Sequence, residues 1–411
     1  MTSTVSSSST PNSVQNGRQP RPGALITLFL APAFIFANMY TTQAILPVFS
    51  ADFGVSAPTA GLTVSLLVLA VAIGSLFYGP LSDRIGRKTV MVGASALVII
   101  PTILCGFAPN FTVLVLLRMS QGFLMPGLTS VAIPYVNEEF AGKGRGLAMG
   151  IYTSGLTLGG LFARVGSSAI TGIYNWRIAM DIFALPTLIA VIVMWRFLPD
   201  TRSKHIIATR TDKPSPTNRK AIVLQTLRDM LMHLHNRRLI GAFIVGFTLF
   251  FGYIGVFTFL PYYLAGPLFR LPTIALGLVY LLWLTGVFAP LAGTIAARIG
   301  SRRAIAYSMG LAAIGMLISL IPSLPIVILG LGLLALGMFA TQPAVNLYLG
   351  NSATRAKGTA ASMYLSLYYF GGSIGAILPG FALLWNGWTC VILLCLGMVC
   401  VALVADWVLC R

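Results

Sequence analysis

The chain has 411 residues, of which 57% are hydrophobic and only 9% are charged, and its mean hydropathy is +0.87. A water-soluble globule cannot bury so large an apolar fraction, so the composition excludes a soluble domain and predicts an integral membrane protein. The formal net charge is +18, but the basic residues fall in short clusters between apolar runs, which argues against a nucleic-acid partner.

The chain begins with a polar stretch, 1–22, that is rich in Ser, Thr, Pro and Asn, and we expect a disordered cytoplasmic tail there rather than a cleavable leader. Apolar segments of about 20 residues follow, each long enough to cross a hydrocarbon layer of about 30 Å as a helix. We predict twelve spans in an all-α integral membrane fold, at 24–48, 60–81, 88–107, 111–136, 145–167, 176–197, 239–264, 273–297, 303–321, 325–349, 358–383 and 387–409.

A polar linker, 199–238, divides the spans into two sets of six. We therefore predict two six-helix bundles with pseudo-symmetry, over 23–198 and 239–411. Part of the linker is expected to form a helix at the membrane surface, because it carries an apolar stripe: Val223, Leu224, Leu227, Leu231 and Leu234.

The distribution of basic residues predicts the orientation. If both termini are cytoplasmic, all Lys and Arg residues lie on the cytoplasmic side except Arg118, Arg164, Arg177 and Arg270. The positive-inside rule then predicts a multi-pass protein of the cytoplasmic (inner) membrane.

Two stretches repeat one frame in the two halves. "GPLSDRIGRK" (Gly79–Lys88) matches "GTIAARIGSR" (Gly293–Arg302), with Ala297 where the first copy has Asp83. "GLAMGIYTSGLTLGG", from Gly146, likewise matches "GTAASMYLSLYYFGG", from Gly358. Two parallel six-helix repeats indicate alternating access around a central site between the halves.

Three motifs resemble those of the major facilitator superfamily. "GPLSDRIGRK" is similar to its loop 2–3 signature, G-x-L-a-D-r-x-G-r-K, and "LLRMSQGF" resembles the helix 4 signature R-x-x-q-G of proton-coupled members. "SGLTLGG" resembles the helix 5 antiporter signature G-P-x-x-G-G, with Leu156 in place of the proline. The resemblance extends from about residue 25 to 409 and implies a twelve-span exporter of drugs or metabolites driven by proton antiport.

The loop 2–3 motif predicts a conformational latch. Its two glycines allow a tight turn, and Asp83 is placed to meet the positive N-terminal end of a neighbouring helix, which the family architecture suggests is the helix beginning near Gly358. The basic residues are placed to meet two acids at the end of the fourth span. The predicted latch comprises Gly79, Asp83, Arg84, Gly86, Arg87, Lys88, Glu138 and Glu139. The second copy lacks matching acids, so we expect packing alone there.

Charges inside spans are costly and predict function. The candidates for coupling are Arg118, Gln121, Arg164 and Asp181. Arg118 is expected to bind an anionic substrate, to tune a proton site through Gln121, or to bond helix carbonyls. Asp181 is expected to pair locally with Arg177, four residues earlier, or with Arg164 across helices as an outer gate or titratable site.

Small residues of the fifth span, Gly155, Gly159 and Gly160, are expected to allow close helix packing. Polar and aromatic residues near mid-span predict an amphipathic pocket for a neutral or anionic metabolite. The candidates are Asn38, Tyr40, Gln43, Tyr152, Tyr253, Gln342, Asn346, Tyr364 and Tyr368.

No hydrolase or nucleotide-binding motif occurs in the sequence. We expect no enzymatic activity, no metal and no cofactor, with the proton gradient as the energy source. The leading hypothesis is a monomeric secondary active transporter in the lipid bilayer that exports a small organic molecule by proton antiport. The alternatives are uptake or exchange of an organic anion bound at Arg118, and a membrane receptor that does not transport.

Overall fold

The computed structural model describes the chain except residues 1–20, 141, 200–227, 229, 354–356 and 411. In the described part, the N-terminal bundle contains α1 (Pro22–Tyr40), η1 (Gln43–Ile45), α2 (Leu46–Phe53), α3 (Ala57–Ile85), α4 (Arg87–Gly106), α5 (Phe111–Leu124), α6 (Pro126–Glu139), α7 (Gly142–Ile173), α8 (Trp176–Ile182) and α9 (Ala184–Phe197). The C-terminal bundle contains α12 (Arg237–Ala265), α13 (Thr273–Leu278), η2 (Val279–Phe288), α14 (Ala289–Ile299), α15 (Ser301–Ile318), α16 (Leu324–Ser352), α17 (Lys357–Gly375) and α18 (Leu378–Leu409).

The described helices confirm the all-α membrane fold. Ten of them, with broken neighbours joined, are long and apolar enough to cross a membrane. The ninth and eleventh predicted spans correspond to α15 and α17, which begin with basic residues and are shorter. These complete two bundles of six spans each.

Several predicted spans are interrupted. The fourth span breaks at Met125, where α6 begins with Pro126, and α2 and α14 also carry a proline in the first turn. Proline lacks an N–H and favours a helix start, which explains these breaks. The last helix departs from helical geometry at Asn386 and Gly387, and this turn separates the last two predicted spans.

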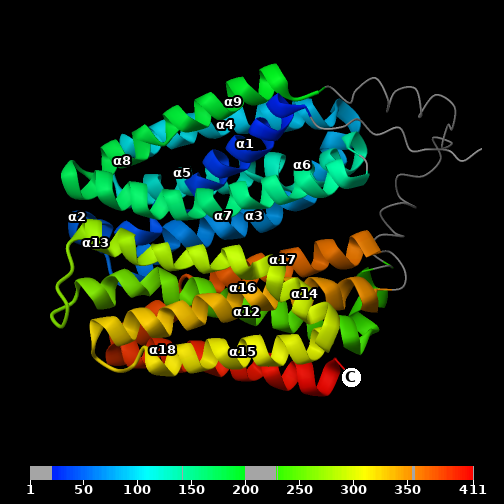
Figure 1. The fold of residues 1–411 in the computed structure, drawn as a ribbon. Coiled ribbons are helices and arrows are strands. Elements are labelled where there is room, and N and C mark those ends of the chain that lie inside the picture. Colours follow the sequence, from blue (N-terminus) through cyan, green and yellow to red (C-terminus); the bar gives the residue numbers. More distant parts are fainter. Residues whose placement is uncertain (1–20, 141, 200–227, 229, 354–356, 411) are drawn as a thin grey trace, which may run out of the picture.

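The two bundles lie side by side along their length (Figure 1). Across their interface α3 packs against α17, and α7 packs against α13 and η2. We call one end of the molecule the linker end. It carries the α3–α4 turn, the end of α9, the start of α12 and the C-terminal end of α18. We call the opposite end, which carries α2, α8 and α13, the far end (Figure 1).

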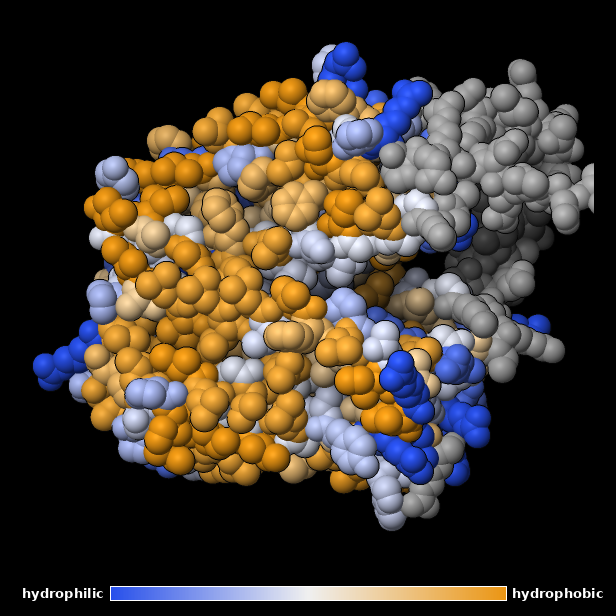
Figure 2. Space-filling view, in the orientation of Figure 1, coloured by the Kyte–Doolittle hydropathy of each residue, from blue (hydrophilic) through white to orange (hydrophobic). Residues whose placement is uncertain are grey.

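Apolar residues cover most of the visible sides of both bundles, and hydrophilic residues gather toward the linker end (Figure 2). Large apolar side chains such as Phe77, Ile173, Trp195 and Leu384 are exposed in the described chain. Such a surface is unfavourable in water and matches the hydrocarbon of a bilayer.

Glycine contacts repeat between the bundles. A Cβ added to Gly159 of α7 would lie 2.1 Å from the carbonyl oxygen of Ala33 in α1. In the second bundle, a Cβ on Gly371 of α17 would lie 2.1 Å from the carbonyl oxygen of Phe247 in α12. The helices at equivalent positions of the two halves therefore approach each other closely at a glycine, as the predicted duplication requires.

The predicted packing role of the other helix 5 glycines also has a structural basis. A Cβ on Gly155 would lie 2.4 Å from the carbonyl oxygen of Phe29, and one on Gly160 would lie 3.1 Å from the Trp283 ring of the other bundle.

The tail 1–20 and three residues of the predicted surface helix, Val223, Leu224 and Leu227, lie outside the described residues. The remaining two, Leu231 and Leu234, are exposed.

Replacing Gly159 with alanine should destabilise the protein by about 1–3 kcal/mol, because the new methyl group overlaps the α1 backbone. Gly150→Ala in the same helix is the matched control, since a Cβ there meets nothing within 4 Å and alanine favours helix more than glycine does. The apparent unfolding temperature in detergent should fall for Gly159→Ala alone. Equal temperatures for both variants would contradict the close packing.

Candidate functional site

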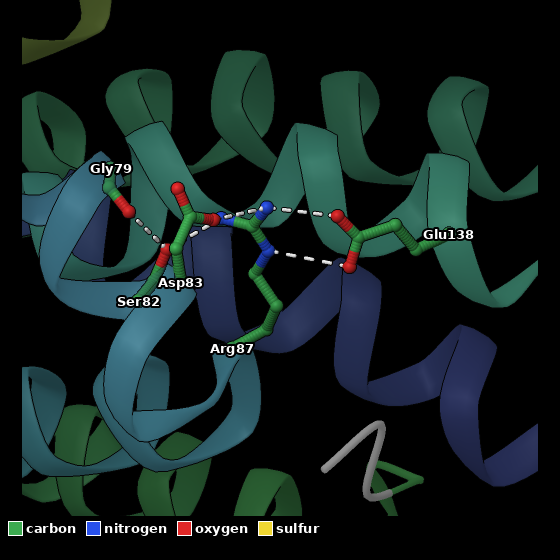
Figure 3. Close-up of polar contacts among 5 residues, drawn as sticks. All are labelled: Gly79, Ser82, Asp83, Arg87 and Glu138. Atoms are coloured by element: carbon green, nitrogen blue, oxygen red, sulfur yellow. Dashed lines mark hydrogen bonds and ion pairs between the residues drawn. The ribbon is translucent and has the colours of Figure 1, made fainter. Parts of the chain in front are cut away.

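The loop between α3 and α4 holds a charge cluster within the N-terminal bundle (Figure 3). Arg87 Nη2 lies 2.7 Å from Asp83 Oδ1 and 2.8 Å from Glu138 Oε1. Arg87 Nε donates to Glu138 Oε2 at 3.3 Å, and Nη1 donates to Ser82 Oγ at 2.6 Å. Gly86, with φ of +100°, makes the turn that brings Arg87 back toward Asp83.

Only part of the predicted latch is joined in this way. Arg87 bonds Glu138, whereas no ion pair of Arg84 or Lys88 with Glu138 is found among the described residues. Gly79 contributes its carbonyl, which accepts from Ser82 Oγ at 2.7 Å. The ion pair found for Asp83 is with Arg87 of its own bundle, and its contact with the helix that begins near Gly358 stays a prediction.

The second copy of the motif keeps the turn. Gly300 has φ of +93°, close to the value at Gly86. Ala297 and Ser301 occupy the positions of Asp83 and Arg87, so no equivalent ion pair forms. However, Arg302 Nη2 donates to the backbone oxygen of Asp406 in α18 at 3.3 Å. This turn therefore has a hydrogen bond to a backbone carbonyl in addition to packing, and no ion pair is found for it among the described residues.

Arg118 is fully buried, with 0% exposure, and its guanidinium caps the broken end of α1. Nη1 donates to the carbonyl of Asn38 at 2.6 Å and to Gln121 Oε1 at 2.7 Å, and Nη2 donates to the carbonyl of Met39 at 2.9 Å. Thr41, Thr42 and Thr63 supply longer contacts. The last carbonyls of a helix lack partners within it, so this arginine satisfies them.

The same network takes up two further predicted residues. Asn38 Nδ2 donates to Thr187 Oγ1 at 2.9 Å, and Gln121 Nε2 donates to Thr102 Oγ1 at 2.8 Å. Thr102 in turn donates to Asn38 Oδ1 at 3.2 Å. Of the roles considered for Arg118, the carbonyl-bonding one describes this geometry, and Asn38 belongs to the network rather than to the predicted pocket.

Arg164 is also fully buried, but it lies where the two bundles meet. Its guanidinium carbon is 3.8 Å from the ring centroid of Tyr40 and 3.5 Å from that of Trp283. Nη1 donates to the carbonyl of Gly160 at 2.6 Å, and Nε donates to Gln43 Oε1 at 2.8 Å. Gln43 Nε2 donates across the interface to Thr258 Oγ1 at 2.8 Å. A cation thus lies between aromatic faces from both bundles without an acidic partner among the described residues.

Aromatic rings continue from this arginine into the C-terminal bundle. Tyr253 stacks on Trp283 with centroids 5.0 Å apart, and Phe250 stacks on Tyr368 at 4.0 Å. We call the set formed by Arg164, Tyr40, Gln43, Tyr253, Trp283, Phe250 and Tyr368 the aromatic cage. Trp283 and Phe250 were missed from the sequence because apolar aromatic residues are ordinary in membrane spans. The dense clusters "VYLLWL" and "TLFFGY" were the available signal.

The remaining predicted pocket residues lie at varied distances from this cage. Tyr364 contacts Tyr368, with centroids 6.0 Å apart, and Gln342 lies beside the Tyr364 hydroxyl. Tyr152 is buried, and its hydroxyl donates to the carbonyl of Thr129 at 3.2 Å within its own bundle. Asn346 is exposed on α16. The structure therefore brings together Tyr40, Gln43, Tyr253, Tyr364 and Tyr368 with Arg164.

Two buried polar atoms of the cage have no hydrogen-bond partner in the described chain. They are Trp283 Nε1 and Tyr253 OH. Both come from the C-terminal bundle. Buried polar groups are nearly always paired, so two exceptions next to a buried cation make the cage the candidate binding surface.

Asp181 forms neither of its two predicted pairs. Arg177 donates instead to the carbonyls of Gly106 and Ala108, at 3.2 and 2.8 Å. The Asp181 carboxylate packs against Gly106, where a Cβ would lie 2.1 Å from Oδ1, and Oδ1 has no partner in the described residues. Neither pair forms because the arginines direct their donors elsewhere, Arg177 to the end of α4 and Arg164 to Gly160 and Gln43.

Hydrogen bonds between the bundles lie toward the far end. Ser50 and Tyr262 hydroxyls are 2.6 Å apart, and Ser65 and Ser373 hydroxyls are 3.0 Å apart. Ser168 bonds the carbonyl of Thr273. These contacts close the bundles against each other at the far end, beyond the cage.

Two six-helix bundles with duplicated packing and close contacts between them are typical of a membrane transporter built from repeats. The family model described as Major Facilitator Superfamily matches residues 28–376 and 269–410. The chain belongs to this superfamily and is a multi-pass membrane transporter of its type.

Curated relatives and solved structures agree with this assignment. The inner membrane transport protein YnfM of Escherichia coli (strain K12) is 32% identical over 366 residues, which cover 88% of this chain and 84% of that protein. A Buchnera aphidicola transporter is 32% identical over 365 residues, covering 89% and 86%. An inward-facing bacterial homologue of the human lysosomal transporter Spinster shares the fold, with a TM-score of 0.76, 15% identity, and coverage of 95% of this chain and 98% of that one.

Asp83→Asn should slow transport in reconstituted vesicles several-fold while changing stability by less than about 1 kcal/mol, because the Asp83 side chain is 53% exposed. The physical reason is that Arg87 loses one of two acids that hold it at the turn. Asp52→Asn, which removes the same charge at the far end, is the control. Normal initial rates for Asp83→Asn, with a substrate found by ligand screening, would contradict the latch role.

Proposed function

We propose that the protein is a secondary active transporter for a small organic molecule that carries a planar ring and an anionic or hydrogen-bond-accepting group. The observation that carries this proposal is the aromatic cage, in which Arg164 lies between Tyr40 and Trp283 next to unpartnered donors. Stacking surfaces suit a ring, and an arginine suits a carboxylate or similar acceptor.

The charge of the cage favours a neutral or anionic cargo. Arg164 is its cation, and no acid among the described residues contacts the cage rings. A strongly cationic molecule would be repelled by Arg164 without compensation in this low-dielectric interface. The hydroxyl of Tyr253 and the indole N–H of Trp283 add neutral donors.

The proposed direction is export by proton antiport across the cytoplasmic membrane. The linker end is assigned to the cytoplasm because nearly all Lys and Arg residues lie in segments at that end. With this orientation the far-end closure corresponds to a cage that loads from the cytoplasm. The motif resemblance to proton-coupled exporters supports the proton gradient as energy source, and no bound cofactor is part of the proposal.

Two alternatives differ in measurable ways. Uptake or exchange of an organic anion would use the same cage, because Arg118 already has all its donors directed to protein acceptors. A receptor that does not transport would bind ligand without vesicle flux. Flux under an imposed pH gradient, measured in both directions, separates export, uptake and binding alone.

Tyr253→Phe should weaken ligand binding about tenfold without loss of stability, because its hydroxyl has no partner in the described chain. Tyr280→Phe is the matched control: its hydroxyl donates to the carbonyl of Phe257 at 2.6 Å, so this variant should lose stability and keep ligand preference. Thermal-shift screening with aromatic carboxylates and their neutral amides provides both readouts.

Arg164→Gln should abolish the preference for the carboxylate over its amide, and Arg164→Lys should retain part of it. Arg177→Gln at the far end controls for the loss of one positive charge. An unchanged preference in Arg164→Gln would refute the cage as the binding site.

Asp181→Asn tests proton coupling, since Asp181 is a membrane-embedded acid of the N-terminal bundle with an unpartnered oxygen. If this carboxylate exchanges the coupled proton, the variant should lose the pH dependence of flux while still binding ligand. An unchanged pH profile would remove Asp181 from the coupling mechanism.

A further inference from the structure

Gln43 joins the buried cation of the cage to the other bundle. It lies in η1, between α1 and α2, and its side chain is fully buried. Arg164 Nε donates to Gln43 Oε1 at 2.8 Å, and Arg164 Nη2 donates to the same oxygen. On the other side, Gln43 Nε2 donates to Thr258 Oγ1 of α12 at 2.8 Å. A guanidinium has donors only, so the amide oxygen must face Arg164 and the amide nitrogen must face Thr258.

The two N–H groups that converge on Gln43 Oε1 form an edge of the guanidinium that suits a carboxylate. A carboxylate accepts both hydrogen bonds and gains from its opposite charge, whereas a neutral amide offers one oxygen. The other polar contacts of Arg164 are with the carbonyl of Gly160 and with the side chain of Tyr40. Since no acid among the described residues pairs with this cation, Gln43 occupies the position that suits the anionic group of a cargo molecule.

Gln43 also begins a row of contacts that closes the far end. Leu46 follows it three residues later and Ser50 four residues after that, so the three share one face of η1 and α2. Tyr262 OH donates to the carbonyl of Leu46 at 3.1 Å and lies 2.6 Å from Ser50 Oγ. Thr258 and Tyr262 are four residues apart in α12 and also share a face. One short segment thus carries three contacts with α12, and the first of them touches the cage cation.

We propose that Gln43 couples cargo binding to the opening of the far end, an inference that rests on the proposed cargo class. The anionic group of the cargo takes the Nε–Nη2 edge of Arg164, and the displaced amide leaves Thr258. The row then loses its first contact, and the hold of α2 on α12 weakens. A ligand shifts a conformational equilibrium only through interactions that differ between the two states, and this exchange of acceptors is such a difference.

Gln43→Glu tests the exchange of acceptors. The new carboxylate accepts from Arg164 and from the Thr258 hydroxyl, so both contacts are kept, but it neutralises Arg164 and competes with an anionic cargo. Benzoate and benzamide serve as charged and neutral probes in titration calorimetry of the full-length protein in detergent. The preference for benzoate over benzamide should fall about tenfold, because one charge-assisted pair is lost. A merely structural role of Gln43 would weaken both probes alike.

Thr258→Val removes the bridge and leaves Gln43 in contact with Arg164. Benzoate then no longer has to break the bond between Gln43 and Thr258, so it should bind about fivefold more tightly, in line with the net contribution of one hydrogen bond. Amide hydrogens of α2 should also exchange with deuterium faster in this variant without any probe, and in the wild type when benzoate is bound.

Thr248→Val is the matched control for this variant. Thr248 is buried in the same helix, and its hydroxyl donates to the carbonyl of Ile244 at 2.8 Å within that helix. An unchanged benzoate preference in Gln43→Glu would overturn the coupling role. So would equal benzoate affinity, or equal exchange of α2, in Thr258→Val and Thr248→Val. Failure of the proposed function gives a different pattern, because wild type and Arg164→Gln then bind benzoate equally or not at all.

Discussion

The contact between the two bundles depends on the buried guanidinium of Arg164. Tyr40 of the first bundle and Trp283 of the second lie on it, and Gln43 connects it to Thr258 across the interface. A cation inside an apolar bundle is costly unless π faces and carbonyl oxygens replace its hydration. The position where these groups converge is therefore a structural joint between the bundles, and it is the binding surface that we propose.

The second buried arginine has the opposite character. Arg118 satisfies carbonyls at the broken end of α1, and its donors are all directed to the protein. Both arginines are fully buried, but Arg118 is surrounded by hydrogen-bond acceptors, whereas Arg164 lies against aromatic rings. Tyr40 is the last residue of α1, and Gln43 follows three residues later. Because Arg118 holds the end of α1 in place, it also positions these two residues against Arg164.

The duplicated loop has diverged chemically while its backbone has not. Gly86 and Gly300 adopt nearly the same positive φ, and close glycine contacts recur at Gly159 and Gly371. In the first copy Arg87 is neutralised by Asp83 and Glu138. In the second, Arg302 donates to the backbone oxygen of Asp406 in α18, so the two copies are held by different contacts.

The sequence by itself determined the membrane class, the division into two sets of six spans, the repeat, and the approach of the loop 2–3 basic residues to the acids at the end of the fourth span, of which the structure selects Arg87 and Glu138. Each follows from hydrophobic length, or from a motif whose residues lie close along the chain or at adjacent helix ends. Tertiary structure alone decided the roles of Arg118, Arg164 and Asp181, the membership of Trp283 in the cage, and the approach of Asp406 to Arg302. These depend on which helix faces which, and the apolar periodicity of a membrane span does not specify that facing, because lipid and protein neighbours are equally apolar.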